Sequence, residues 1–244
     1  MFKKKLILAK THDYCAVEEP KLTVVMIHGI ASDSGTYNHA LQYLEGTTSL
    51  KEVRFVTFDL LGAGESPKSD DLEYGYREQL EALHNSIEKL KVRTPLVLVG
   101  HSMGTFIVTR YANTYKKSVR ELILVSPPVY TEENLQDPAF AAAIKGFEAV
   151  VSAKNPAILK EKAFTASMKK IVMNRYNYKN LVDLKTPTTL IYGSEDQLIA
   201  AFNYPVLLKS NGKYLRAIKT EGRHGVSRDK YSKILEILEG ILHA

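Results

Sequence analysis

The stretch Gly-His-Ser-Met-Gly at residues 100–104 has the residue types and spacing for nucleophilic chemistry. The apolar run Leu96–Val99 leads into it, and an amphipathic stretch follows at once. A strand that becomes a helix at a single residue puts that residue on a tight, strained bend, where flanking glycines remove side chains that would collide. Such a bend lifts the Ser102 hydroxyl out of the sheet edge. We therefore expect Ser102 to be accessible to both a base and a substrate.

A base and an acid must accompany this serine, because its hydroxyl is a poor nucleophile until an imidazole takes its proton. The imidazole in turn needs a carboxylate that fixes its tautomer. Residues just past the C-terminal ends of parallel strands share one edge of the sheet. Asp196 follows the apolar run Thr188–Tyr192, and His224 follows the last predicted strand. The chain order Ser, Asp, His is typical of a serine on a strand-to-helix turn, although Glu195 is a rival acid.

The elements that must position these residues alternate along the chain. Nearly continuous apolar runs predict buried parallel strands at 22–27, 53–58, 96–99, 121–125, 188–192 and 214–218, with amphipathic helices between most of them. Two short antiparallel strands, Leu6–Ala9 and Tyr14–Val17, are expected at the edge. This alternation predicts an α/β fold with a mostly parallel, doubly wound sheet.

The strand pattern lapses at about residues 129–181. Helical segments such as Pro138–Val151 and Pro156–Met173 occupy this stretch, and the sheet then resumes. We interpret it as a small helical cap inserted after the sixth strand of a single domain, residues 1–244. The cap offers apolar or amphipathic side chains to roof a pocket: Phe140, Phe147, Phe164, Tyr176 and Tyr178.

Composition restricts the classes of partner and cofactor. Cys15 is the only cysteine, which excludes an intrachain disulfide and a cysteine-based metal cluster. The formal net charge is +6, but most lysines lie between acidic residues instead of forming a basic stripe with aromatics, so nucleic-acid binding is not expected. The glycine spacings of phosphate-binding and dinucleotide-binding loops are missing, as is a histidine and carboxylate cluster at metal-ligand spacing. We expect no cofactor and no metal.

Targeting signals are weak. The apolar run Leu6–Ala9 is much shorter than the roughly 7–15 residues of a secretory signal. No stretch approaches the ~18 apolar residues of a membrane span. The expectation is a cytoplasmic protein without a membrane span, and the sequence leaves its oligomeric state open.

Five motifs in order resemble the serine hydrolases of the α/β-hydrolase fold, over almost the whole chain. They are His28-Gly29, Asp59-x-x-Gly62-x-Gly64-x-Ser66, the stretch at 100–104, Gly193-x-x-Asp196 and the late His224. Each motif alone is loose, whereas all five in this order are specific.

The resemblance implies a role for each matching residue. Ser102 would be the nucleophile, His224 the base, and Asp196 the acid, which the spacing after Gly193 favours over Glu195. The backbone N–H groups of Ile30 and Met103 would form the oxyanion hole. The other six histidines are expected on the N-terminal strands, on helices or in structural positions beside the site.

Serine at position 102 also bears on the reaction, because relatives that cleave carbon–halogen bonds or epoxides carry aspartate there. Acyl transfer on a small-molecule substrate remains: carboxylic esters first, then thioesters, lactones or amides. The resemblance leaves two alternatives: a carbon–carbon bond hydrolase of a diketone-like acid and a non-catalytic receptor for a small ligand. A compact cap favours acyl groups of roughly two to six carbons, since each buried methylene contributes about 0.8 kcal/mol only while the pocket has room.

Overall fold

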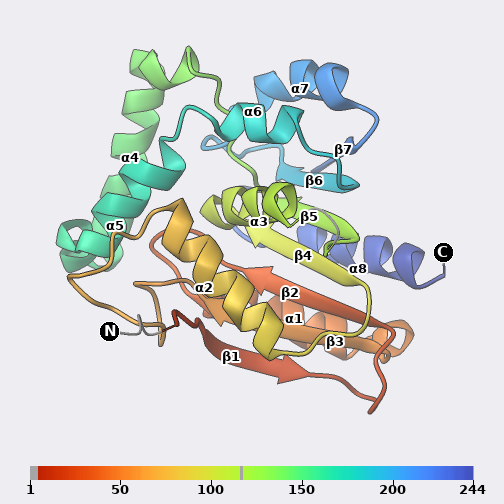
Figure 1. The fold of residues 1–244 in the computed structure, drawn as a ribbon. Helices are drawn as coiled ribbons and strands as arrows, with labels where there is room; N and C mark the ends of the chain where they lie inside the picture. The colour runs from red at the N-terminus through yellow and green to blue at the C-terminus, as the bar shows by residue number, and fades with distance from the viewer. Residues whose placement is uncertain (1–4, 116–117, 244) are drawn as a thin grey trace.

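The computed structural model of the protein describes residues 5–115 and 118–243, and its centre is a seven-stranded sheet of order β1-β3-β2-β4-β5-β6-β7 (Figure 1). The strands are β1 (Ala9–Tyr14), β2 (Leu22–Ile27), β3 (Val53–Asp59), β4 (Leu96–His101), β5 (Glu121–Val125), β6 (Thr188–Gly193) and β7 (Leu215–Thr220). Neighbouring strands run parallel, apart from the antiparallel pair β1 and β3. The predicted mostly parallel, doubly wound sheet is confirmed.

The start of the chain differs from the prediction. The two expected strands Leu6–Ala9 and Tyr14–Val17 are wrong, since the single strand β1 occupies Ala9–Tyr14 and pairs with β3. Its side chains are exposed or half-buried, so apolar patterning could not locate it. The helical insertion therefore follows the fifth strand, β5, and not the sixth.

Helices cover both faces of the sheet (Figure 1). Side chains that alternate along β4 separate the two layers: Leu96 and Leu98 belong to one apolar cluster, Val97 and Val99 to the other. The first cluster includes residues of α2 (Tyr76–Lys89), α3 (Met103–Thr114), α6 (Asn177–Val182) and α7 (Tyr204–Asn211). The second includes residues of α1 (Asn38–Glu45) and α8 (Arg228–Leu242).

The chain between β5 and β6 is helical and contains no strand, and residues 126–187 are all described. Its helical pieces are a 3-10 turn (Asn134–Gln136), α4 (Pro138–Lys154), a second 3-10 turn (Pro156–Lys160), α5 (Lys162–Ser167), a π-helical turn (Met168–Val172) and α6. The helical segment expected over Pro156–Met173 is thus divided into three short helical pieces. Glu161, with extended backbone, separates the 3-10 turn from α5, and Met173 N–H donates to Met168 O in the i→i+5 pattern of a π turn.

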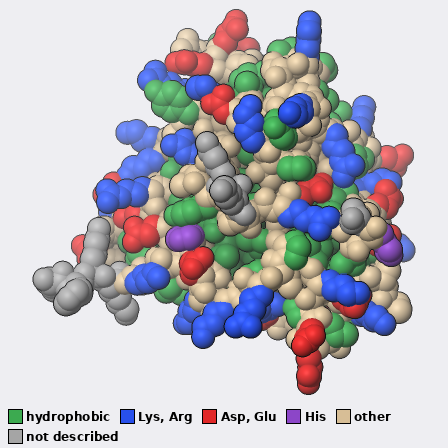
Figure 2. Space-filling model, turned by 45° about the vertical axis from the view of Figure 1, so that its right-hand side comes forward, with side chains coloured by type: hydrophobic (Ala, Val, Ile, Leu, Met, Phe, Trp, Pro, Cys, Tyr) green, Lys and Arg blue, Asp and Glu red, His purple; other side chains and the backbone are tan. Residues whose placement is uncertain are grey.

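Charged side chains are spread over the surface. Figure 2 shows lysine and arginine side chains scattered across one face, with acidic side chains between them. Among the described residues, no helix has the length and apolar character needed to cross a bilayer.

Candidate active site

Ser102 occupies the one-residue turn between β4 and α3, in the middle of the sheet. Its backbone has φ +51° and ψ −120°, a left-handed conformation that costs a residue with a side chain roughly 1–3 kcal/mol. The turn also needs Gly104, because a Cβ atom there would lie 2.3 Å from the carbonyl oxygen of Ile27. The predicted strained bend is thus present at Ser102.

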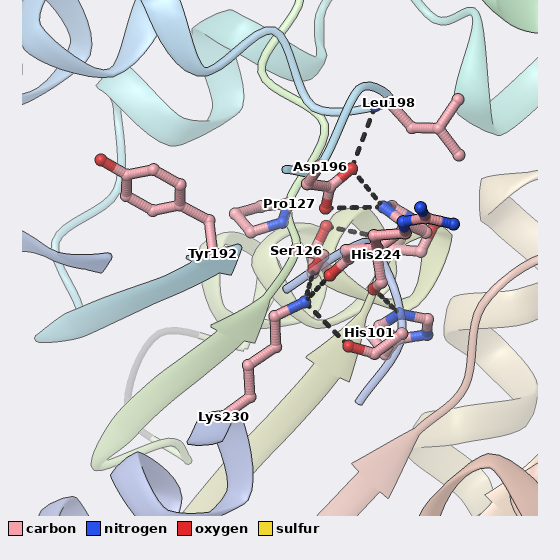
Figure 3. Close-up of polar contacts among 12 residues, drawn as sticks. His101, Ser126, Pro127, Tyr192, Asp196, Leu198, His224 and Lys230 are labelled. Carbon is pink, nitrogen blue, oxygen red and sulfur yellow. Dashed lines mark hydrogen bonds and ion pairs between the residues drawn. The ribbon is translucent and has the colours of Figure 1, made fainter. Parts of the chain in front are cut away.

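Asp196 and His224 meet at the same edge of the sheet, beyond β6 and β7. Nδ1 of His224 lies 3.0 and 2.9 Å from the two carboxylate oxygens of Asp196 (Figure 3). The Asp196 side chain is 0% exposed and the His224 side chain 20%. Glu195 points away, with a 65% exposed side chain 3.8 Å from Arg223. The structure therefore brings Asp196, and not Glu195, against the histidine.

The surroundings of Asp196 keep it ionised at neutral pH. Burial raises the pKa of Asp196, but the hydrogen bond and charge of His224, the Leu198 N–H and the nearby Ser126 hydroxyl outweigh burial and leave this pKa below its ordinary value. The Leu198 N–H donates to Oδ1 across 3.0 Å. A carboxylate that accepts the Nδ1 proton of His224 leaves Nε2 of the imidazole as the free basic nitrogen.

The two backbone N–H groups expected at an oxyanion hole belong to residues that line the same cavity as Ser102. Met103 is the first residue of α3, so its N–H has no carbonyl one turn earlier to bond. The N–H of Ile30 makes no backbone hydrogen bond in the described part of the chain. Gly29 brings this loop against the turn, since a Cβ atom at Gly29 would lie 3.0 Å from the Cβ of Ser102.

Buried polar side chains hold the loop of Ile30 in place. Nδ1 of His28 donates to the carbonyl of Gly29, and its Nε2 accepts from the N–H of Leu60. Burial lowers the pKa of His28, so the ring is neutral and serves both contacts. The carboxylate of Asp59 accepts the N–H groups of Ser34 and Glu65, each across 2.8 Å, and so joins the loops after β2 and β3.

A small apolar cavity is lined by the serine, the histidine and the two residues whose N–H groups are described above. Ser102, His224, Ile30 and Met103 line a space of about 30 Å³. The rest of its wall is formed by Pro128, Tyr130, Ile144, Phe147, Met168, Val172 and Leu198. Of the aromatic residues proposed from the sequence, only Phe147 lines it; Phe164 lines a neighbouring cavity, Phe140 packs against Tyr130, and Tyr176 is 48% exposed.

Sequence patterning missed most of this wall. Met168 and Val172 are four residues apart, which indicates one face of a helix but not what that face meets. The π turn bulges there, and the side chain of Asn177 donates to the carbonyls of Ile171 and Val172. Met168 and Val172, the first and last residues of this turn, both line the cavity.

Two larger spaces adjoin this cavity. One, of about 310 Å³, extends past Ile30 and Met103 along the loop of residues 60–64. The other is a groove of about 900 Å³ between α4 and the loops of Asp196 and His224. Four of the basic residues of the insertion line neither space nor the small cavity: Lys145, Lys169, Lys170 and Arg175. In the described residues, no three His, Cys, Asp or Glu side chains gather as metal ligands would.

This chain resembles a protein family, individual relatives and solved structures. A family described as alpha/beta hydrolase fold matches residues 23–160. A protein named probable lysophospholipase BODYGUARD 5, from Arabidopsis thaliana, is 34% identical over 121 residues, which cover 49% of this chain and 27% of that protein. The (lyso)-N-acylphosphatidylethanolamine lipase of Mus musculus is 29% identical over 145 residues, covering 57% of this chain and 41% of the lipase. This chain therefore matches less than half the length of these two relatives.

The fold has many solved counterparts. A monoacylglycerol lipase from Paleococcus ferrophilus superposes with a TM-score of 0.68 at 20% identity, over 96% of this chain and 98% of the lipase. At this identity the likeness concerns the fold alone.

Proposed function

This chain belongs to the α/β-hydrolase fold family of hydrolases, and we propose that it is a serine hydrolase that cleaves small carboxylic esters through an acyl-serine intermediate. One observation carries the proposal. Ser102 on its strained turn, His224 in its pair with Asp196, and the residues Ile30 and Met103 line a single cavity. This combination provides a nucleophile, an oriented base and an oxyanion site.

The proposed reaction has two halves. The Oγ atom of Ser102 attacks the ester carbonyl while Nε2 of His224 takes the hydroxyl proton, and the N–H groups of Ile30 and Met103 donate to the oxyanion. Collapse of this intermediate breaks the carbon–oxygen bond, and His224 returns its proton to the leaving alcohol. A water molecule then gives a proton to His224 and attacks the acyl-serine, which releases the acid and restores Ser102. Asp196 stabilises the imidazolium in both halves.

The cavity supports a preference for short acyl groups. Roughly 10–15 Å³ accommodates one water-sized group, so about 30 Å³ of apolar space holds a short chain only. The larger groove lies on the side of His224, which must protonate the leaving group, and it is lined by polar groups such as Gln197 and Arg223. We therefore place the acyl group in the small cavity and the alcohol in this groove. The lipase and lysophospholipase names of the relatives support ester hydrolysis as the reaction class.

A covalent probe and a graded ester series test the proposal. A fluorophosphonate should label Ser102 alone, as read by mass spectrometry of the tryptic peptide. Hydrolysis of p-nitrophenyl acetate and butyrate should lose roughly 10⁴–10⁶ in kcat in Ser102→Ala. The exposed Ser210, on α7, provides the matched control, and Ser210→Ala should keep wild-type rates.

Two experimental outcomes would favour a different function. Ligand binding without ester turnover above the Ser102→Ala background would favour the receptor. Turnover of diketone-like acids with no esterase activity would favour the carbon–carbon bond hydrolase.

A further inference from the structure

Lys230 is a fully buried lysine beside the candidate active site. It is the third residue of α8 and is 0% exposed, on the helix face that also buries Ile234 and Leu238. Lysine is almost never fully buried without compensation, and the N-terminal end of a helix is the less favourable end for a cation. Burial lowers the pKa of Lys230 to about 8. A cation in this place therefore destabilises the fold unless hydrogen-bond acceptors around it compensate for the loss of water.

The surroundings supply three acceptors for its three N–H donors. Nζ of Lys230 donates to Ser126 Oγ across 2.8 Å, to the carbonyl of Gly225 across 2.8 Å and to the carbonyl of Arg223 (Figure 3). A neutral amine has only two donors, so the ammonium form fits this site best. No carboxylate is bonded to it in the described residues.

These contacts fix the loop that carries His224. The carbonyls of Arg223 and Gly225 flank the histidine, and both accept from Lys230. The carbonyl of His224 itself accepts from Nε2 of His101 across 2.9 Å. Three successive carbonyls of this loop are thus held by two buried side chains from α8 and β4.

Ser126, which accepts from this ammonium group, also influences Asp196. Ser126, directly after β5, accepts from Lys230, and its hydroxyl is one of the groups that lower the pKa of the Asp196 carboxyl group. Figure 3 shows Lys230 extending from α8 to the centre of this cluster, with Ser126 and Asp196 beyond it and His224 beside it. Lys230 therefore contacts both the loop that carries His224 and the residue Ser126, which influences Asp196.

We propose that Lys230 is a positioning residue: its ammonium group fixes the loop of His224 and, through Ser126, supports the carboxylate of Asp196, so that the imidazole stays at the cavity that Ser102 lines. This inference rests on the proposed hydrolase function. Catalysis needs the base within about 0.5 Å of its productive place, and a displacement of about 1 Å can cost on the order of 10²-fold in rate.

Lys230→Met tests this role, because methionine has a similar length but no donors and no charge. The matched control is Lys233→Met, the same change on the same helix, where the lysine side chain is 35% exposed and pairs with Glu236. With p-nitrophenyl acetate, kcat per fluorophosphonate-titrated site should fall roughly 10–100-fold in Lys230→Met while KM stays within about threefold. Lys233→Met should match the wild type in both constants.

A proton NMR measurement separates positioning from stability alone. With ¹⁵N-histidine labelling, the low-field Nδ1 proton of His224, bonded to Asp196, should be seen in the wild type and in Lys233→Met. In Lys230→Met it should broaden or disappear. Should Lys230→Met not fold, Lys230→Gln is measured in the same way with the same criteria.

The proposal is overturned if folded Lys230→Met keeps kcat per active site within threefold and retains the His224 resonance, even with a lower Tm. Failure of the proposed function is recognised separately, as absent turnover and absent Ser102 labelling in the wild type. In that case the NMR comparison still decides whether Lys230 orders His224.

Discussion

His101 donates a hydrogen bond from Nε2 to the backbone carbonyl of His224 across 2.9 Å. The residue directly before the proposed nucleophile thus holds the residue proposed to deprotonate it. Burial lowers the pKa of His101 to about 3, so the ring is neutral at working pH and donates as the Nε2–H tautomer. The loop of His224 is therefore anchored to the nucleophile turn as well as to α8.

Replacing His101 should show what this anchor contributes. In His101→Ala the carbonyl of His224 loses its donor, and kcat should fall roughly tenfold, since a net hydrogen bond is worth about 0.5–1.5 kcal/mol. His101→Gln, whose amide can still donate, should stay within about threefold of the wild type. Steady-state kinetics on p-nitrophenyl acetate measure both variants. Equal losses in the two would contradict the hydrogen-bond explanation.

Asp196 and Glu195 form a matched pair for testing the acid. Asp196→Asn should lower kcat by on the order of 10³–10⁴, because an amide cannot hold the His224 tautomer as a carboxylate does. Glu195→Gln should stay within a few-fold, as the Glu195 side chain is 65% exposed. Measuring kcat for ester hydrolysis at neutral pH tests both variants. An exchange of these effects between the two variants would reject the assignment.

Burial of Lys230 should leave a signature in the pH dependence of stability. Its pKa is about 8 in the folded protein against an ordinary value of 10.5, so between these pH values the unfolded chain binds more protons than the native one. Unfolding free energy therefore rises with pH in this window. Between about pH 7.5 and 9.5 the wild type should gain about 2 kcal/mol relative to Lys230→Met, at about 1.36 kcal/mol per pH unit.

Urea unfolding of both proteins at these two pH values measures this difference, and titrations shared by the two proteins cancel in it. Asp196 is the charged group that opposes the lowering of the Lys230 pKa. A constant difference between the wild type and Lys230→Met across this window would show that the Lys230 pKa is not lowered.

Acyl-length preference should follow the size of the small cavity. On p-nitrophenyl esters, kcat/KM should peak at roughly two to six acyl carbons, because further methylenes find no apolar space. Met168→Ala enlarges this cavity and should move the optimum to longer chains. Met173→Ala, in the same segment but 41% exposed, should leave the optimum in place. Hydrolysis of emulsified long-chain triglyceride faster than butyryl esters would replace the esterase proposal with a lipase.

The sequence by itself was sufficient for the parallel sheet and for placing Ser102, Asp196 and His224 at one edge of it. Buried parallel strands are continuous apolar runs, and Gly100 and Gly104 mark the turn because backbone crowding there excludes other side chains. The order of strand ends then put Asp196 and His224 at the same edge. These features are local in the chain or follow from topology, so pattern and spacing could find them.

Only the tertiary structure decided the edge strand, the wall of the cavity and the support of the histidine. Strand β1 is held by backbone pairing, which its polar side chains do not reveal. Met168 lines the same cavity as Ser102 from a π turn held by Asn177. Lys230 lies where the period of α8 calls for an apolar residue, and its partners Ser126 and Arg223 come from other parts of the chain. Which acceptors surround a buried cation depends on packing between distant segments, and no local pattern records it.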